Sequence, residues 1–152
     1  MKTLALALCI VMLAGGLATA QHRDVSASDA AWGRARAAAA RTMIDQLDMT
    51  SFPNSIGPRR RSGARTLAQY GFTRIETFDD GWAQARMADG SWQIGLFVLD
   101  DGARRKRLCF TDTATNGGTY RITTTLDVAA QPGGLWRVVG RPGPVKGCSG
   151  GR

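Results

Sequence analysis

Hydrophobic residues recur along this chain first with the period of a helix and later with the two-residue period of strands. In residues 28–48 apolar positions follow every three or four residues, and the charged side chains lie off that stripe. Ser26 or Ser28 can cap the start of this segment. The pattern predicts a helix over 28–48 that covers a sheet with its apolar stripe, which consists of Trp32, Ala35, Ala39, Met43 and Leu47.

From residue 71 onward, runs of strand-forming residues alternate with turn signals that contain glycine, such as Asp89 followed by Gly90. The glycines allow the left-handed backbone of tight turns, and short turns join antiparallel neighbours. The pattern predicts an antiparallel meander of five to six strands at about 71–78, 82–88, 91–99, 106–112, 119–129 and 135–140.

Alternation within the later strands assigns their faces. Phe97 and Leu99 lie on the side of the strand 91–99 opposite to its main apolar face, so both faces of this strand are expected to be covered. In the strand 119–129, Thr125 is expected to face water together with Arg121, Thr123 and Asp127. The main apolar faces of the two strands consist of Trp92, Ile94, Leu96 and Val98, and of Tyr120, Ile122, Thr124, Leu126 and Val128.

The segment between the helix and the meander carries prolines and glycines, so residues 50–64 are predicted to form a loop. One helical turn at 66–70, ended by Gly71, is predicted to follow it. A helix and then a meander make an α+β domain with the helix packed on the sheet. This is the general outline of cystatin-like and nuclear-transport-factor-like domains, a comparison of architecture only, and it is also compatible with a small barrel.

The first twenty residues have the pattern of a cleaved signal peptide. Lys2 is followed by an apolar stretch at 4–13 and by a small-x-small site at 18–20. The predicted organisation is therefore a signal peptide at 1–20, a flexible N-terminus at 21–27 and a single domain at 28–152. No transmembrane segment is expected after cleavage, and the protein is expected to be periplasmic or secreted.

Cleavage would remove Cys9 and leave Cys109 and Cys148 in an oxidising compartment. One structural disulfide between them is predicted, and loop closure would make it worth about 4 kcal/mol. A redox or metal pair is the alternative, but the two cysteines lack a CxxC spacing and have no histidine near them in sequence.

Basic residues exceed acidic ones, and the net charge of +8 falls to +7 without Lys2. Two clusters concentrate this charge and can attract an anionic envelope component or protein. They can equally be solvated loops, and an exported protein is not expected to bind nucleic acid. We name them the loop cluster and the hairpin cluster; the first consists of Arg59, Arg60, Arg61 and Arg65, and the second of Arg104, Arg105, Lys106 and Arg107.

Candidate catalytic chemistry is sparse. The motif G-x-S-x-G, which is typical of the nucleophile elbow of hydrolases, occurs at residues 147–151. Such an elbow needs a helix after it and a histidine base, and His22 is the single histidine. Acidic pairs such as Asp100 and Asp101 precede turn glycines, so no metal is predicted. The sole glutamate, Glu76, lies in a strand where a cross-strand ion pair is the ordinary interpretation.

The sequence therefore favours a non-catalytic binding or interaction module, without a cofactor, over an enzyme. A small-molecule binder or enzyme is the first alternative, with a pocket between helix and sheet lined by Trp32, Tyr70, Glu76 and Trp92. An enzyme inhibitor that inserts residues 52–62 is the second. Most tryptophans are expected to pack in the core, and Trp82, directly after a turn, is expected to be the most exposed of the four.

Overall fold

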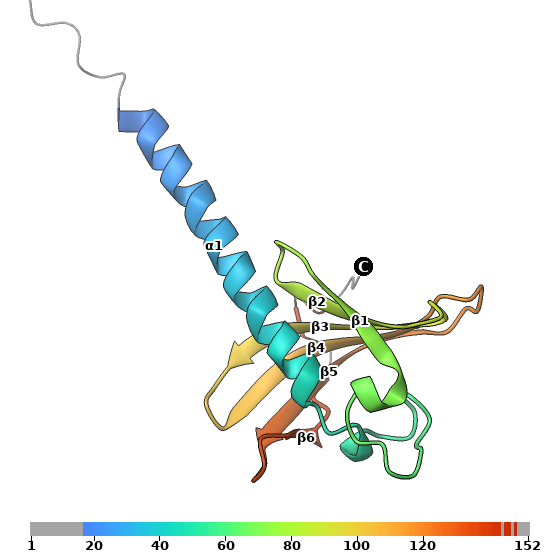
Figure 1. Ribbon diagram of the computed structural model, residues 1–152. Coiled ribbons are helices and arrows are strands. Elements are labelled where there is room, and N and C mark those ends of the chain that lie inside the picture. Colours follow the sequence, from blue (N-terminus) through green and yellow to red (C-terminus); the bar gives the residue numbers. More distant parts are fainter. Residues whose placement is uncertain (1–16, 144, 147, 149–152) are drawn as a thin grey trace, which may run out of the picture.

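The computed structural model describes residues 17–143, 145–146 and 148, and shows one long helix and one sheet (Figure 1). Two short 3₁₀ helices, η1 (Met49–Ser51) and η2 (Ala68–Tyr70), lie between them. The helix is α1 (Leu17–Gln46), and the strands are β1 (Phe72–Thr77), β2 (Trp82–Met87), β3 (Trp92–Asp101), β4 (Arg105–Ala114), β5 (Arg121–Ala130) and β6 (Trp136–Gly140).

The six strands form one antiparallel sheet in the order β1-β2-β3-β4-β5-β6, which confirms the predicted meander and the α+β class. The turn glycines act as predicted, since Gly81 and Gly90 have φ values of 93° and 73°. The predicted turn before β1 is η2, and Gly71 ends it with a φ of 95°.

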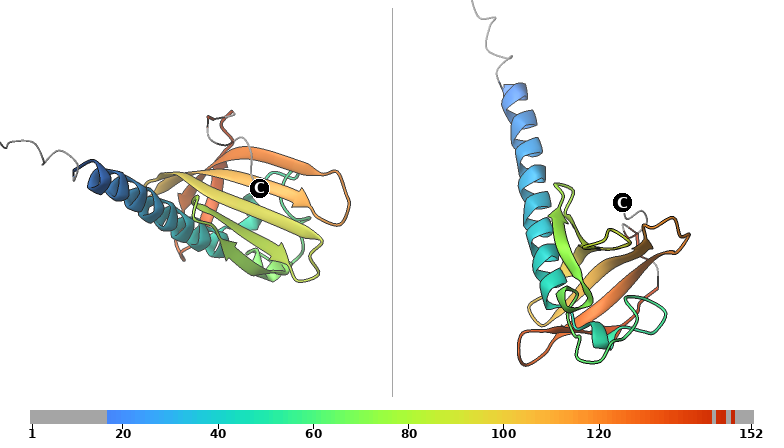
Figure 2. Two further views of the ribbon diagram at one scale, coloured as in Figure 1. Left: turned by 90° about the horizontal axis from the view of Figure 1, so that it is seen from above. Right: turned by 45° about the vertical axis from the view of Figure 1, so that its right-hand side comes forward.

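The C-terminal half of α1 lies across one face of the sheet, which we call the helix face. Met43, Ile44 and Leu47 are almost completely buried there against Ile94 and Leu96 of β3. Burial of these side chains holds helix and sheet together, at about 25 cal/mol for each Å² of apolar surface removed from water. The N-terminal half of α1 projects past the end of the sheet (Figures 1 and 2).

The helix starts earlier than the expected residue 28. Residues 1–16 of the predicted signal peptide lie outside the described residues, and the remaining four begin α1. Residues 21–27, expected to form a flexible N-terminus, are helical in this structure. No helix in the described part of the chain combines the length and the apolar content that a membrane crossing requires.

The apolar stripe predicted for the helix is wrong at its N-terminal end. Trp32 is 53% exposed, and Ala35 is exposed too. The reason is the place where the helix leaves the sheet. At Gly33 the helix touches the β1–β2 turn so closely that a Cβ atom would overlap the carbonyl oxygen of Asp79. Before this point the helix runs past the end of the sheet and its described side chains are mostly exposed, although Trp32 still lies 6.4 Å from Phe97 of β3.

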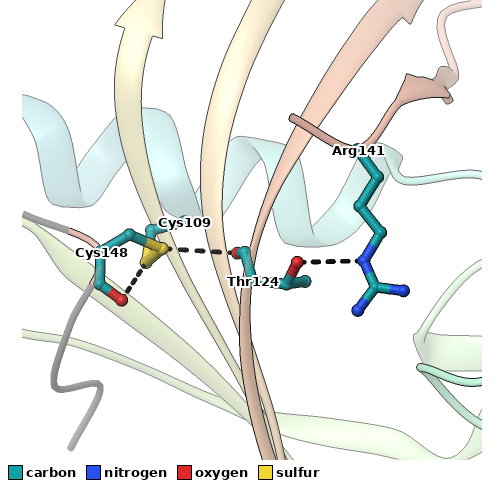
Figure 3. Close-up of a disulfide and its surroundings, with 4 residues drawn as sticks. All are labelled: Cys109, Thr124, Arg141 and Cys148. Atoms are coloured by element: carbon teal, nitrogen blue, oxygen red, sulfur yellow. Dashed lines mark hydrogen bonds between the residues drawn. A yellow bond between two sulfur atoms is a disulfide. The ribbon is translucent and has the colours of Figure 1, made fainter. Parts of the chain in front are cut away.

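The opposite side of the sheet, which we call the tail face, is covered in part by the described residues after β6, among them Cys148. Cys109 of β4 and Cys148 form a disulfide with a Cα–Cα distance of 5.3 Å (Figure 3). Each sulfur atom also lies 3.4 Å from a carbonyl oxygen, that of Cys148 or of Thr124. The disulfide thus attaches the tail to the middle of the sheet.

Two expectations for the tail face are wrong for the same reason. Trp82 is only 9% exposed because it packs beside the disulfide, with Phe97 of β3 next to it. Thr125 is 1% exposed because it is the register partner of Cys109 and lies under the tail. The partial burial of Phe97 agrees with the prediction that β3 is covered on both faces.

Candidate functional site

A cavity with mainly apolar walls lies beside the end of α1, between the sheet and residues 52–61, which we call the cavity loop. Its volume is about 720 Å³. The sheet contributes Phe72, Met87 and Trp92, the strand-flanking residue Tyr120 adds another aromatic ring, and Tyr70 also lines the cavity. Pro53, Ile56 and Pro58 of the loop form the facing wall. The cavity is therefore mainly apolar and aromatic inside.

A buried carboxylate fastens the cavity loop to the sheet. Asp112 of β4 is 0% exposed and points to the helix face. The backbone N–H of Gly57 donates a 2.7 Å hydrogen bond to its Oδ2 atom, and the indole N–H of Trp92 donates one to Oδ1. The Tyr120 hydroxyl lies 3.0 Å from Oδ2 and also donates to this carboxylate. One side chain thus fixes the loop and both aromatic walls.

The two aromatic side chains held by Asp112 lie against each other. The ring centroids of Trp92 and Tyr120 are 5.3 Å apart with an interplanar angle of 37°, a common arrangement for aromatic pairs. Burial raises the pKa of Tyr120 to about 12, and the negative charge of Asp112 adds to this effect. The hydroxyl consequently keeps its proton at physiological pH and can serve as a hydrogen-bond donor.

The cavity loop folds back onto the sheet and buries its own apolar residues. Phe52 and Ile56 are each 3% exposed, and the Phe52 ring packs 5.1 Å from that of Phe110. An inhibitor that inserts residues 52–62 would present such side chains to its target. Here they belong to the core, so this segment has the character of a cavity wall.

Three members of the loop cluster line the mouth of this cavity, but they differ in their partners. Arg60 donates to the carbonyl oxygen of Phe52 at 3.2 Å, and Arg61 donates to that of Gln69. The guanidinium of Arg61 also lies 5.6 Å from the centre of the Tyr70 ring. Within the described part of the chain, the Arg59 side chain has no hydrogen-bond or ion-pair partner.

Arg65, the fourth member of the loop cluster, is bound to a buried acid. Its Nη2 atom lies 2.7 Å from Oδ2 of Asp48, whose side chain is 7% exposed. Burial alone would raise the pKa of Asp48, but the hydrogen bonds from Arg65 and Thr50 outweigh it and hold this pKa below its usual value. Arg65 is therefore a structural partner of Asp48, although most of its side chain remains exposed.

The hairpin cluster lies at the other end of β4, roughly 30 Å from the cavity by strand length. Lys106 pairs with Asp101 and lies 4.9 Å from the ring of Trp136. Arg107 donates to both carboxylate oxygens of Asp127, at 2.7 and 3.2 Å. Arg104 and Arg105 are exposed. The structure therefore does not combine the two clusters into one basic surface.

Two of the four expected pocket residues, Tyr70 and Trp92, line this cavity, whereas Trp32 and Glu76 lie elsewhere. Trp32 lies on the helix, 6.4 Å from Phe97 and under the guanidinium of Arg36. The expected pocket between helix and sheet is occupied by core side chains. The cavity is instead displaced to the end of the sheet that the helix leaves uncovered.

Sequence reasoning missed Asp112, although the pattern of its strand carries a signal for it. Leu108, Phe110 and Asp112 occupy alternate positions and therefore share one face. A carboxylate that continues a buried apolar row needs hydrogen-bond donors around it. That requirement is met here by Gly57 and two aromatic side chains.

No group of three or more histidine, cysteine, aspartate or glutamate side chains among the described residues could hold a metal ion. No family model, no curated protein and no solved structure matches this chain. Function must therefore be argued from the cavity and its surroundings.

Proposed function

We propose that this chain is an exported, non-catalytic binding module of the cell envelope. Its ligand would be an anionic molecule with an apolar or aromatic body, held in the cavity under residues 52–61. The sequence favours an anionic partner because of the two basic clusters, and it offers a small-molecule pocket as the first alternative. A ligand of this kind combines both. The cavity at the end of the sheet carries the argument.

The size and lining of the cavity support a small-molecule ligand. A volume of about 720 Å³ lies in the range of roughly 300–1,000 Å³ that ligand pockets occupy. Its walls are mostly apolar, and the aromatic pair of Trp92 and Tyr120 offers a flat surface for a ring or chain. A few polar groups at the mouth would then set the orientation of the ligand.

Arg59 is the group best placed to provide that orientation. Arg59 lines the cavity, and its guanidinium has no partner among the described residues, whereas Arg60 and Arg61 are bound to backbone carbonyl oxygens. A guanidinium forms two parallel hydrogen bonds with a carboxylate, phosphate or sulfonate. The proposed ligand therefore places its apolar part against the aromatic wall and its anion beside Arg59.

Export is supported by the leader-like pattern of residues 1–20 and by the disulfide between Cys109 and Cys148. Disulfides persist in oxidising compartments and are rare in the cytosol. The net positive charge would also favour attraction to the anionic surfaces of an envelope.

The test uses anilinonaphthalene sulfonate, a dye with an aromatic body and one sulfonate, in a fluorescence titration of the oxidised protein. Arg59→Gln should weaken dye binding about five- to tenfold, since it removes a charge-assisted pair at the mouth. Arg104→Gln is the matched control, because it removes the same charge from an exposed site at the far end of the sheet. That variant should bind the dye as the native protein does.

Equal weakening by both substitutions would mean that the dye responds only to net charge, and the proposal would then fail. Replacement of all three consecutive arginines is a poorer test, because Arg60 and Arg61 also brace the cavity loop. Filling the cavity with Met87→Trp gives a second measurement. It should reduce dye binding without any change of charge.

A further inference from the structure

Strand β1 lies at one edge of the sheet, and its outer side pairs with no other strand in the described part of the chain. The N–H of Phe78 donates to the carbonyl oxygen of Trp82. Hydrogen-bonded pairs alternate in an antiparallel ladder, so the backbone groups of Glu76 and Arg74 also point toward β2. Those of Ile75 and Thr77 therefore point outward and are open to another strand.

The side chains of this edge carry charges that the chain itself satisfies poorly. Arg74 stands directly opposite Arg86 of β2 in the register, and like charges in that position repel each other. Arg74 has no hydrogen-bond or ion-pair partner in the described segments. Glu76, two residues away on the same face, is 4.0 Å from Arg86 in a pair whose side chains are both about half exposed.

We propose that β1 binds β1 of a second copy of this chain, antiparallel and centred on Ile75. In this register Arg74 lies opposite Glu76 of the partner subunit, and the two-fold symmetry repeats the pair on the other side of the centre. The open backbone groups of Ile75 form hydrogen bonds with those of the partner's Ile75. The two six-stranded sheets become one continuous sheet.

The charges select this register over its neighbours. One copy of β1 can slide along the other only in steps of two residues if the outward backbone groups of both are to remain paired. Each such step moves the centre of symmetry by one residue. A symmetric shift of the centre to Arg74 places Arg74 opposite its own copy, and a shift to Glu76 does the same for the carboxylate. Both neighbouring registers therefore bring like charges together. The register centred on Ile75 brings opposite charges together twice.

The side chains on the other face of β1 fit the same arrangement. Ile75 points to the helix face, is half-buried and packs against the core. In the dimer it meets its own copy, so both chains extend their core across the junction. Thr73 and Thr77 flank it, and threonine pairs are favourable across antiparallel strands. A bulge at Thr73 ends the regular ladder on that side.

Charge reversal tests this dimer by analytical ultracentrifugation over a range of protein concentrations. Arg74→Glu places two carboxylates opposite each other, and Glu76→Arg places two guanidinium groups opposite each other. Each should weaken the dimer about tenfold, because two favourable pairs become two repulsive ones. A mixture of the two variants should form a heterodimer at near-native affinity. The double variant R74E/E76R should also recover the dimer.

Arg137→Glu is the control, since it makes the same charge change on exposed β6. It should leave the dimer unchanged. A native protein that sediments as a monomer at every concentration overturns the proposal, as does a dimer that the two reversals leave intact. Failure of the mixed variants to recover the dimer would show that another surface holds it. None of these positions lines the cavity, so dye binding tests the proposed function independently.

Discussion

Carboxylates lie near both ends of β4, but their environments differ. At the cavity end, the carboxylates of Asp48 and Asp112 are buried and fasten the irregular segment after α1 to the sheet. At the hairpin end, Asp101 and Asp127 pair with Lys106 and Arg107 near the surface. Acidic residues therefore hold an irregular segment in place at one end, whereas at the other end they form ion pairs that solvent screens.

This difference explains why only one of the two basic clusters borders a cavity. A segment without regular structure must satisfy its backbone groups in some other way, and buried carboxylates do so around residues 48–61. In a hairpin, the backbone N–H and C=O groups form hydrogen bonds with the neighbouring strand. The charged side chains are therefore not needed for this purpose, and they extend into solvent and pair across the strands. The cavity lies where this irregular covering meets the sheet.

The strongest test of the comparison is Asp112→Asn, which keeps the shape of the side chain but places an amide N–H₂ group among three hydrogen-bond donors. We expect a loss of about 2–4 kcal/mol in the free energy of unfolding, because a buried network is broken. Urea denaturation of the oxidised protein measures it. The same substitution at Asp127 should cost less than about 1 kcal/mol, and equal costs would contradict the proposed contrast.

A smaller effect is expected from Arg65→Gln, which removes the guanidinium from the buried Asp48. Since Arg65 itself is largely exposed, solvent screening limits the expected cost to about 1 kcal/mol. The pKa of Asp48 is lowered in the folded state, so the interaction contributes stability above the unfolded value of about 3.9. This contribution is lost as the pH falls through the folded pKa.

Urea unfolding at a series of pH values therefore tests Arg65→Gln in two ways. It measures the loss in the free energy of unfolding at neutral pH, and it shows how that loss changes with pH. The native protein should lose more stability than the variant between neutral pH and the acid range. Arg65→Lys keeps a charge near Asp48 and should restore part of the difference. Parallel curves for the native protein and the Gln variant would show that Arg65 does not control the ionisation of Asp48.

The sequence predicts the regular elements well because their signals are local. Alternating apolar residues and turn glycines define all six strands, and Gly71 ends the turn before β1 as expected. Errors arise where a distant segment decides the environment. Thr125 is buried by a tail that the disulfide draws across the sheet, and Trp32 is exposed because the helix has passed the end of the sheet.

The cavity could be predicted only in part for the same physical reason. Tyr70 and Trp92 are aromatic residues near a predicted loop, so a pocket role could be suspected from sequence. Asp112 acquires its role only when residues 53–58 fold onto its strand, a contact between positions 55 residues apart. Glu76 looks like a candidate acid in sequence, but the meander places it on an open edge. Long-range contacts of this kind leave no periodic signal.

The smallest effect is expected at the hairpin end, from Arg107→Gln. Arg107 makes two hydrogen bonds to Asp127, and these lower the pKa of that carboxyl group. Both side chains are partly exposed to solvent, so we expect only a small cost in the free energy of unfolding at low salt. At 1 M salt the screening length is only about 3 Å, and the difference from the native protein should then disappear. Urea unfolding at the two salt concentrations measures this. A cost that persists in high salt would mean that Arg107 stabilises the hairpin through packing of its aliphatic stem, and the two ends of β4 would then differ less than their burial indicates.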